Sequence, residues 1–205
     1  MPDPRTAPVV EPIIESEQLL ADGLEQCLES RPLVLEIGFG RAELILDQAG
    51  ADPDRTYLGV EVSRKRVAKA GRRVERAGLE NVKLIHATAE YLVERVLPPS
   101  SVSECWINFS DPWPKKRHFK RRLFQPPFIA RLAQVLEPSA VLHAATDHPG
   151  YAEWIDDVLR GALDLVNLHA PERWSREAPL RRQTGYEAEW LALGRSIAYF
   201  EYRRT

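Results

Sequence analysis

From Pro32 onward, short apolar runs alternate with longer polar segments along the chain. Short apolar runs are typical of strands and the longer segments of helices, so their alternation predicts a parallel sheet covered by helices. Strands are expected at 33–39, 57–62, 82–87, 103–109, 140–146, 163–169 and 196–202. Helices are expected at 42–49, 64–78, 127–136 and 150–161, and the connection at 184–195 is expected to be partly helical.

These seven strands favour an α/β fold with a doubly wound, mostly parallel sheet whose last hairpin is antiparallel. In such a sheet the ligand site lies at the carboxyl ends of the strands, where the strand order reverses. The 205 residues, 44% of them apolar, suffice for one ordinary domain, expected at 31–205. Residues 1–30 are expected to form an arm, with a proline-rich extended part at 1–12 and an acidic helix at 16–30.

Charge is distributed unevenly, although the net charge is only −2. Residues 1–30 contain seven acidic side chains and one basic side chain, whereas residues 61–150 contain sixteen Lys and Arg against nine Asp and Glu. Because the positive charge is concentrated in one part of the chain, a surface that binds RNA is compatible with a negative net charge.

Several classes of protein are disfavoured by composition. The two cysteines, Cys27 and Cys105, lie far apart and outside any C-x-x-C spacing, so neither a disulfide framework nor a zinc site is expected. The histidines are scattered singly, and no metal is expected. No apolar run approaches the ~20 residues that cross a bilayer, and the first residues lack the layout of a secretion signal. The expectation is a cytoplasmic protein without a membrane partner.

A glycine-containing turn follows the first main strand. In LEIGFG, Gly38 and Gly40 stand between a strand and a helix, where glycine lets the backbone turn tightly and approach a ligand. The third glycine of a dinucleotide fingerprint is missing. Glu36 within this turn would repel a pyrophosphate but suits an ammonium or hydroxyl group. Glu61, 25 positions later, ends the next strand, near the spacing at which a dinucleotide fold binds ribose. The alternatives are a simple turn and a solvated Glu61 paired with Arg64 or Lys65.

The fourth main strand continues into NFSDPWPKKRHFKRR, residues 108–122. Prolines 112 and 114 restrict the backbone and predict a stiff loop that holds Asp111 and Trp113 in set positions. Six of the eight residues from Lys115 to Arg122 are cations, which suit phosphate groups. A basic run is often only a solvated surface, but here it directly follows a fixed carboxylate at a strand end.

The late segment RRQTGYEAEW, residues 181–190, reads as the start of a helix. Thr184 would be the cap, and Glu187 would complete a capping box at the third position. A functional role for Thr184 and Glu187 is compatible with this structural one.

Taken together, LEIGFG, GVEVS, NFSDPWPKKRHFKRR, ATDH and TGYE resemble the bacterial tRNA (guanine-N7)-methyltransferases, which modify the variable-loop guanine at position 46. The resemblance covers residues 32–205 and implies a Rossmann-like class I fold that uses S-adenosylmethionine and tRNA. It implies a catalytic role for Asp111 and contacts with the cofactor at Glu36, Gly38, Gly40, Glu61, Thr88 and Asp111. It implies contacts with the substrate at Lys115, Asp147, Thr184, Gly185, Tyr186 and Glu187.

One position departs from the family. The family has Asp followed by Ala after the third main strand, where the Asp receives the adenine amino group; this chain has Thr88 and Ala89. A threonine hydroxyl accepts one hydrogen bond but carries no charge, so backbone groups or Glu90 would take a larger share of adenine recognition.

Guanine N7 has an available lone pair, so its methylation requires no general base. We expect Asp111, with Asp147 or Glu187, to hold N1–H and the N2 amino group and so turn N7 toward the methyl group. Trp113 or Phe119 would stack on the purine, and the cations at 115–117 and 120–122 would follow the RNA backbone. Alternatives are an NAD-dependent oxidoreductase, a tRNA-binding protein without catalysis, and an enzyme that methylates an exocyclic amine. Both a monomer and a homodimer are compatible with the sequence.

Overall fold

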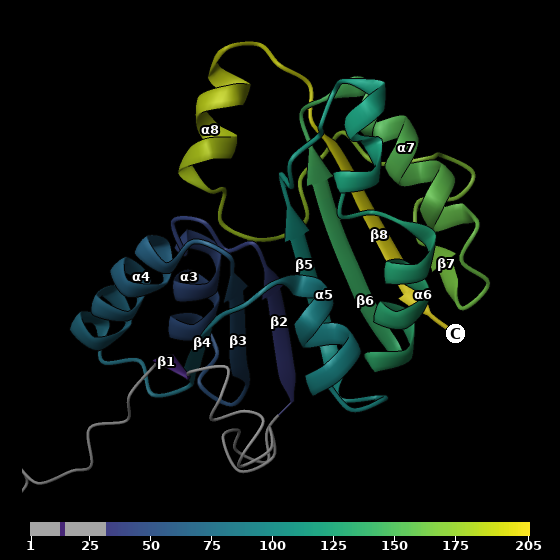
Figure 1. The fold of residues 1–205 in the computed structure, drawn as a ribbon. Helices are drawn as coiled ribbons and strands as arrows, with labels where there is room; N and C mark the ends of the chain where they lie inside the picture. The colour runs from purple at the N-terminus through teal and green to yellow at the C-terminus, as the bar shows by residue number, and fades with distance from the viewer. Residues whose placement is uncertain (1–12, 15–31) are drawn as a thin grey trace, which may run out of the picture.

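The computed structural model describes residues 13–14 and 32–205, which form one sheet of eight strands in the order β1-β4-β3-β2-β5-β6-β8-β7 (Figure 1). The strands are β1 (Ile13–Ile14), β2 (Leu33–Ile37), β3 (Thr56–Glu61), β4 (Val82–His86), β5 (Val102–Asn108), β6 (Leu136–Thr146), β7 (Leu165–Asn167) and β8 (Ala198–Arg204). The helices are α3 (Glu43–Ala51), α4 (Arg64–Ala77), α5 (Ala89–Tyr91), η1 (Leu92–Val96), η2 (Lys116–Arg121), α6 (Pro126–Val135), α7 (Pro149–Arg160) and α8 (Gly185–Ala192). The helix expected at 16–30 lies outside the described residues.

The sheet is doubly wound, as predicted. Strands β1 to β6 pair in parallel, whereas β8 is antiparallel to both β6 and β7. The strand order reverses at β2, because β3 follows on one side and β5 on the other. The carboxyl ends of β2, β3 and β5 therefore surround the point where such folds bind their ligands.

Alternate residues of the central strands enter two cores, one on each face of the sheet. Leu35 and Ile37 of β2 pack with α5, α6 and α7, which lie in front of the sheet in Figure 1. Val34 of the same strand packs on the other face with α3 and α4. All five residues of β2 are buried, as expected for a central parallel strand.

Helix ends carry recognisable capping groups. α4 ends at Gly78, whose φ of +65° is the left-handed conformation of a glycine cap. α7 begins with Pro149, which fits the first turn of a helix because no hydrogen bond from its nitrogen is needed there. Within the described part of the chain, no helix is both long enough and apolar enough to span a bilayer.

Three elements differ from the sequence-based expectation. β6 begins at Leu136 rather than near residue 140, because a bulge with Ser139 at φ +70° accommodates the polar residues 137–139. α5 and η1 form where no helix was expected, although apolar residues at 89, 92, 93 and 96 have helical spacing. β1 adds a short edge strand beside β4.

Gly59 in β3 tests how tightly this fold is packed. A Cβ atom at Gly59 would lie 2.7 Å from Cδ1 of Phe39 and 3.0 Å from side-chain carbons of Ile45 and Leu84. Because the Phe39 ring cannot move aside freely, Gly59→Ala is expected to lower the free energy of unfolding by about 1–3 kcal/mol. At Gly50 in α3, the nearest atom to such a Cβ is 3.9 Å away. Gly50→Ala should therefore be neutral or stabilise by about 0.5–1 kcal/mol. Urea unfolding of both variants tests this, and equal stabilities would contradict it.

Candidate active site

The glycine turn after β2 lies against the end of β3. Gly38 and Gly40 have φ angles of +74° and +52°, which glycine adopts without steric cost. The Gly38 N–H donates to the Val60 carbonyl at 2.8 Å. The predicted tight turn is therefore confirmed, and its backbone faces the carboxyl ends of both strands.

Glu61 fastens this turn to β3. Its carboxylate accepts hydrogen bonds from the N–H groups of Gly40, at 3.1 Å, and Ser63, at 3.0 Å. Its ion-pair partner is Arg66, at 3.4 Å, rather than Arg64 or Lys65, the alternatives that the sequence suggested. Glu61 is only 4% exposed, yet it lines a hollow at the strand ends. The side chain is thus held in one orientation while it faces the hollow.

Glu36 and Asn108 present unpartnered polar atoms at the ends of the neighbouring strands β2 and β5. Both Oε2 of Glu36 and Nδ2 of Asn108 are buried without a hydrogen-bond partner. Burial raises the pKa of Glu36 to about 8, although the backbone N–H of Ile45 and the charge of Arg181 act in the opposite direction. Unpaired buried polar groups cost free energy. A ligand with both a cationic donor and an acceptor would satisfy this pair. The sequence analysis gave Asn108 no role, and its position as the last residue of β5 was the only signal.

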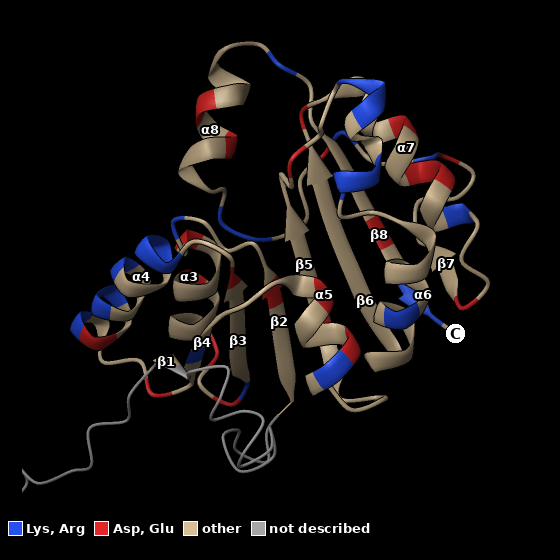
Figure 2. Cartoon of the chain, in the orientation of Figure 1, with Lys and Arg blue, Asp and Glu red and all other residues tan. Residues whose placement is uncertain are grey.

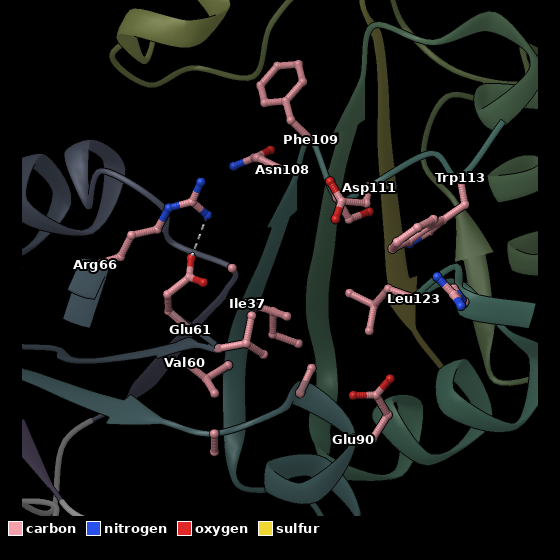
Figure 3. Close-up of a pocket in the computed structure, with 16 residues that line it drawn as sticks. Ile37, Val60, Glu61, Arg66, Glu90, Asn108, Phe109, Asp111, Trp113 and Leu123 are labelled. Atoms are coloured by element: carbon pink, nitrogen blue, oxygen red, sulfur yellow. Dashed lines mark hydrogen bonds and ion pairs between the residues drawn. The ribbon is translucent and has the colours of Figure 1, made fainter. Parts of the chain in front are cut away.

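Two adjoining hollows surround these groups. One, of about 260 Å³, extends from Glu61 and Arg66 across to Asp111 and Trp113, with Glu90 at its lower edge in Figure 3. The other, of about 360 Å³, contains Glu36. They share Gly38, Arg66, Asn108, Phe109 and Asp111. The structure therefore brings Glu36, Gly38, Gly40, Glu61 and Asp111 together at one connected crevice.

The loop after β5 holds Asp111 at the edge of this crevice. Phe109 and Trp113 on either side have positive φ angles of 53° and 40°, an uncommon conformation for such residues that the surrounding contacts must stabilise. The Phe109 N–H donates to the Ala145 carbonyl at 2.8 Å, and Oγ of Ser110 lies 3.1 Å from the Tyr151 hydroxyl. Asp111 itself is exposed, and its carboxylate forms no hydrogen bond or ion pair with any described residue. That carboxylate is free to meet a ligand.

Arg122 does not belong to the RNA-facing cations, which corrects the expectation for residues 120–122. It is 4% exposed and donates from Nε to the Pro112 carbonyl at 2.9 Å. Its guanidinium lies 3.6 Å from the centre of the Phe119 ring, and burial lowers its pKa. Phe119 packs here, whereas Trp113 lines the hollow. The exposed cations of this segment are Lys115, Lys116, Arg117, Lys120 and Arg121.

Glu187 fixes the start of α8 above the crevice. The predicted capping box with Thr184 is present, and the Glu187 carboxylate also accepts hydrogen bonds from Arg181, at 2.7 and 3.2 Å, and from the Tyr199 hydroxyl at 2.7 Å. Glu187 is fully buried. The N–H of Gly185, the residue after the cap, donates to Glu43 of α3 at 2.5 Å.

The other residues predicted to contact the substrate lie on three different segments. Thr184 and Tyr186 line the hollow that contains Glu36, and the Tyr186 ring lies 4.8 Å from that of Phe109. Asp147, after β6, pairs with Arg195 at 3.2 Å. Lys115 is exposed in the loop before η2.

Thr88 lies outside both hollows. Its hydroxyl accepts the N–H of Tyr91 at 3.2 Å and so caps α5. Ala87, Ala89 and Glu90, on either side of it, line the hollow instead. The polar group of this segment that faces the crevice is therefore Glu90.

The remaining chemistry-bearing groups form no second reactive centre in the part of the chain that the structure describes. Cys105 is fully buried, and burial raises the pKa of its thiol. No group of three His, Cys, Asp or Glu side chains within residues 13–14 and 32–205 could hold a metal ion. Cys27 lies outside the described residues.

Comparisons with known proteins find a matching family model and similar relatives. A family model described as "Putative methyltransferase" matches residues 30–200. The chain is 43% identical over 172 residues to a tRNA (guanine-N(7)-)-methyltransferase of Halorhodospira halophila, and the match covers 84% of this chain and 74% of that protein. It is 41% identical to the one from an Arthrobacter species over 78% of this chain and 50% of that protein, so it spans half the length of that relative.

The fold is similar to that of solved methyltransferases. The 16S rRNA methyltransferase KamB matches with a TM-score of 0.59 and 18% identity, over 93% of this chain and 94% of that chain. At this level of identity the likeness concerns the fold alone.

Replacement of Glu187 tests the buried anchor. Glu187→Gln removes the charge that balances Arg181, and both side chains are almost fully buried, at 0% and 3% exposure. The variant should lose about 3 kcal/mol of unfolding free energy. Glu189→Gln, in the same helix, breaks only a 3.6 Å pair with Arg41 in which both side chains are about two-thirds exposed. It should change stability by less than about 0.5 kcal/mol. Similar losses in the two variants, measured by denaturant unfolding, would show that Glu187 has no special role.

Proposed function

We propose that this chain, which belongs to the tRNA (guanine-N7)-methyltransferase family, methylates N7 of the guanine at position 46 in the tRNA variable loop. It has the Rossmann-like fold of S-adenosylmethionine-dependent methyltransferases. The observation that carries this proposal is the crevice itself, where Glu36, Glu61 and the free carboxylate of Asp111 meet at the switch point of the sheet. The family excludes the NAD-dependent oxidoreductase considered from the sequence.

The residues of the crevice fit S-adenosylmethionine. Oε2 of Glu36 and Nδ2 of Asn108 are the unpartnered acceptor and donor that the ammonium and carboxylate of its amino-acid end require. Glu61 would accept from the ribose hydroxyls with its remaining lone pairs, and Gly38 and Gly40 let the backbone approach closely. When bound, the cofactor supplies an electrophilic methyl group on a positively charged sulfur.

Glu90 is the better candidate for adenine recognition. The Thr88 hydroxyl already accepts a hydrogen bond as a helix cap, whereas Glu90 lines the hollow and has a charged acceptor for an amino group. Glu90, together with backbone groups of residues 87–89, would therefore take the place of the aspartate that the family resemblance predicts at position 88.

Asp111 is proposed to orient the base rather than to remove a proton. The N7 edge of guanine carries only acceptors, whereas N1–H and the N2 amino group are donors that a carboxylate binds. Asp111 is exposed at the crevice, and its carboxylate has no partner among the described residues, so it can hold these donors and turn N7 toward the crevice. Its negative charge would also stabilise the positive charge that develops on the purine.

A guanine in a loop suits this geometry. In an A-form helix the N7 edge lies in a deep, narrow groove that side chains cannot enter, so the target base must be unpaired or turned outward. Trp113 lines the hollow and is the candidate stacking group, while Lys115 and the exposed cations after it would bind the RNA backbone. Glu187, whose oxygens already accept four hydrogen bonds, would position Thr184 and Tyr186 instead of holding the base.

Direct transfer tests the proposal. The protein is incubated with methyl-labelled S-adenosylmethionine and an unmodified tRNA transcript, and the product is cleaved chemically at N7-methylguanine. The expected result is one labelled cleavage site in the variable loop, at position 46. A label at another atom or position would contradict the proposed target, and the absence of any label would contradict the activity.

Asp111→Asn separates orientation from cofactor binding. An amide has one acceptor oxygen and one donor nitrogen, so it cannot accept a hydrogen bond at both atoms as a carboxylate does, and it carries no charge. Turnover should therefore fall by about 100-fold or more, while the dissociation constant for S-adenosylhomocysteine stays within a few-fold. Steady-state methyl transfer and calorimetric titration measure the two quantities. Turnover close to that of the unaltered protein would contradict the proposed role of Asp111 in orienting the base.

Glu36 predicts a pH dependence for cofactor binding. Because the pKa of Glu36 is raised to about 8, its carboxyl is mostly protonated at neutral pH in the ligand-free protein and must ionise to bind an ammonium group. The affinity for S-adenosylhomocysteine should rise between pH 6 and 8 and level off above 8, with a slope that approaches tenfold per pH unit. Glu36→Gln should bind weakly and lack this rise. The amino group of the ligand titrates identically in both experiments, so parallel pH profiles would contradict the role of Glu36.

A further inference from the structure

A row of cations runs along the exposed side of α4. Its sequence RKRVAKAGRRVERA contains seven Lys and Arg and one Glu, and the buried side consists of Val67, Ala70, Gly71 and Val74. Four exposed cations, Lys65, Lys69, Arg72 and Arg76, follow one another at intervals of four, three and four residues. This spacing aligns them on one side of the helix over about 16 Å. None of the four forms an ion pair with another described residue.

The row borders a cationic hollow beside the crevice. This hollow, of about 480 Å³, lies between α4 and the glycine turn. Five cations line it, namely Arg41, Lys65, Arg66, Lys69 and Arg73, against a single carboxylate, Glu43. That carboxylate already accepts the N–H of Gly185. Because Gly40, Arg41, Glu43 and Arg66 also line the hollow that contains Glu36, the cationic hollow opens next to the crevice.

The cations of α4 and those of residues 115–121 lie on opposite sides of the crevice. Figure 2 shows the basic residues of α4 near the glycine turn and those of η2 beyond the end of β5. Figure 3 shows Arg66 of α4 across the hollow from Asp111 and Trp113. A polyanion that reaches the crevice from one cationic surface can therefore continue onto the other.

We propose that α4 and its hollow form a second phosphate-binding surface, which holds the RNA backbone on the side of the target base opposite to residues 115–121. This inference rests on the proposed function and adds a contact surface to it. Phosphodiester groups fit because they are regularly spaced anions that do not require a folded partner surface, and the row offers a regular series of cations without apolar groups between them. With one surface on each side, the strand is held at two points, and the base between them is presented to Asp111.

The test is a neutralised row, Lys69→Gln/Arg72→Gln/Arg76→Gln. These three residues lie outside the crevice, and their side chains form no hydrogen bond with any described residue, so the fold and the cofactor site should be unaffected. The control, Arg95→Gln/Arg131→Gln/Arg203→Gln, removes the same charge elsewhere. Arg95 and Arg203 are exposed, whereas Arg131 is half-buried and donates to Gln134 at 2.9 Å. A charge-conserving variant, Lys69→Arg/Arg72→Lys/Arg76→Lys, separates charge from packing. The affinity for unmodified tRNA is measured in the presence of S-adenosylhomocysteine over a range of salt concentrations, beside steady-state methyl transfer.

In the neutralised variant, tRNA affinity should fall at least tenfold. The slope of log affinity against log salt should decrease by about 2, since each single-strand phosphate contact contributes about 0.7. The KM for tRNA should rise, while kcat at saturating tRNA and the affinity for S-adenosylhomocysteine remain within twofold. The control and the charge-conserving variant should behave like the unaltered protein.

Equal losses in the neutralised variant and the control would show a nonspecific effect of net charge and overturn the inference. An unchanged salt slope would also overturn the inference, and an acidic protein would then be the partner to test on this surface. These outcomes concern binding by the variants. Failure of the proposed function would appear separately, as the absence of N7-methylguanine in the product of the unaltered protein.

Discussion

The arrangement of the crevice depends on the carboxylate of Glu187. It joins Arg181, the cap of α8 and the Tyr199 hydroxyl of β8 in one buried network. Because an unpaired buried charge is costly, these hydrogen bonds favour one arrangement of the partners, although Nε of Arg181 has no hydrogen-bond partner among the described residues. α8 buries no other side chain completely, so this polar contact, rather than an apolar face, determines where Thr184 and Tyr186 lie.

Arg122 has a comparable effect on the loop that carries Asp111. Its guanidinium lies among the rings of Phe119, Tyr151 and Trp154 and donates to the Pro112 carbonyl. The loop is thereby fixed to α7, while the carboxylate of Asp111 forms no hydrogen bond or ion pair with the described residues. The charged residues of the two motifs thus divide into two groups. Arg122 and Glu187 are buried and hold the backbone, whereas Asp111 and the cations at 115–117, 120 and 121 are exposed.

Much of the fold could be predicted from the sequence, because apolar runs and their spacing report directly on burial. Each of the seven expected strands overlaps an observed one, and the capping box at Thr184 and Glu187 has a local sequence signature. Local patterns could not predict that Arg122 is buried or that Glu187 also pairs with Arg181 and Tyr199. In a run such as KKRHFKRR, only the packing of distant aromatic side chains decides which cation is buried. The sequence likewise does not show that Nδ2 of Asn108 is buried without a hydrogen-bond partner.

The central claim is that Asp111 holds the guanine by its N1–H and N2 groups and leaves N7 toward the crevice. A structure of the protein with S-adenosylhomocysteine and its tRNA substrate measures this directly. The account predicts an Asp111 carboxylate within about 2.7–3.1 Å of N1 and N2 of the target guanine, with N7 directed at the cofactor sulfur. A bound guanine whose N1 and N2 groups meet other residues, with Asp111 turned to solvent, would contradict it.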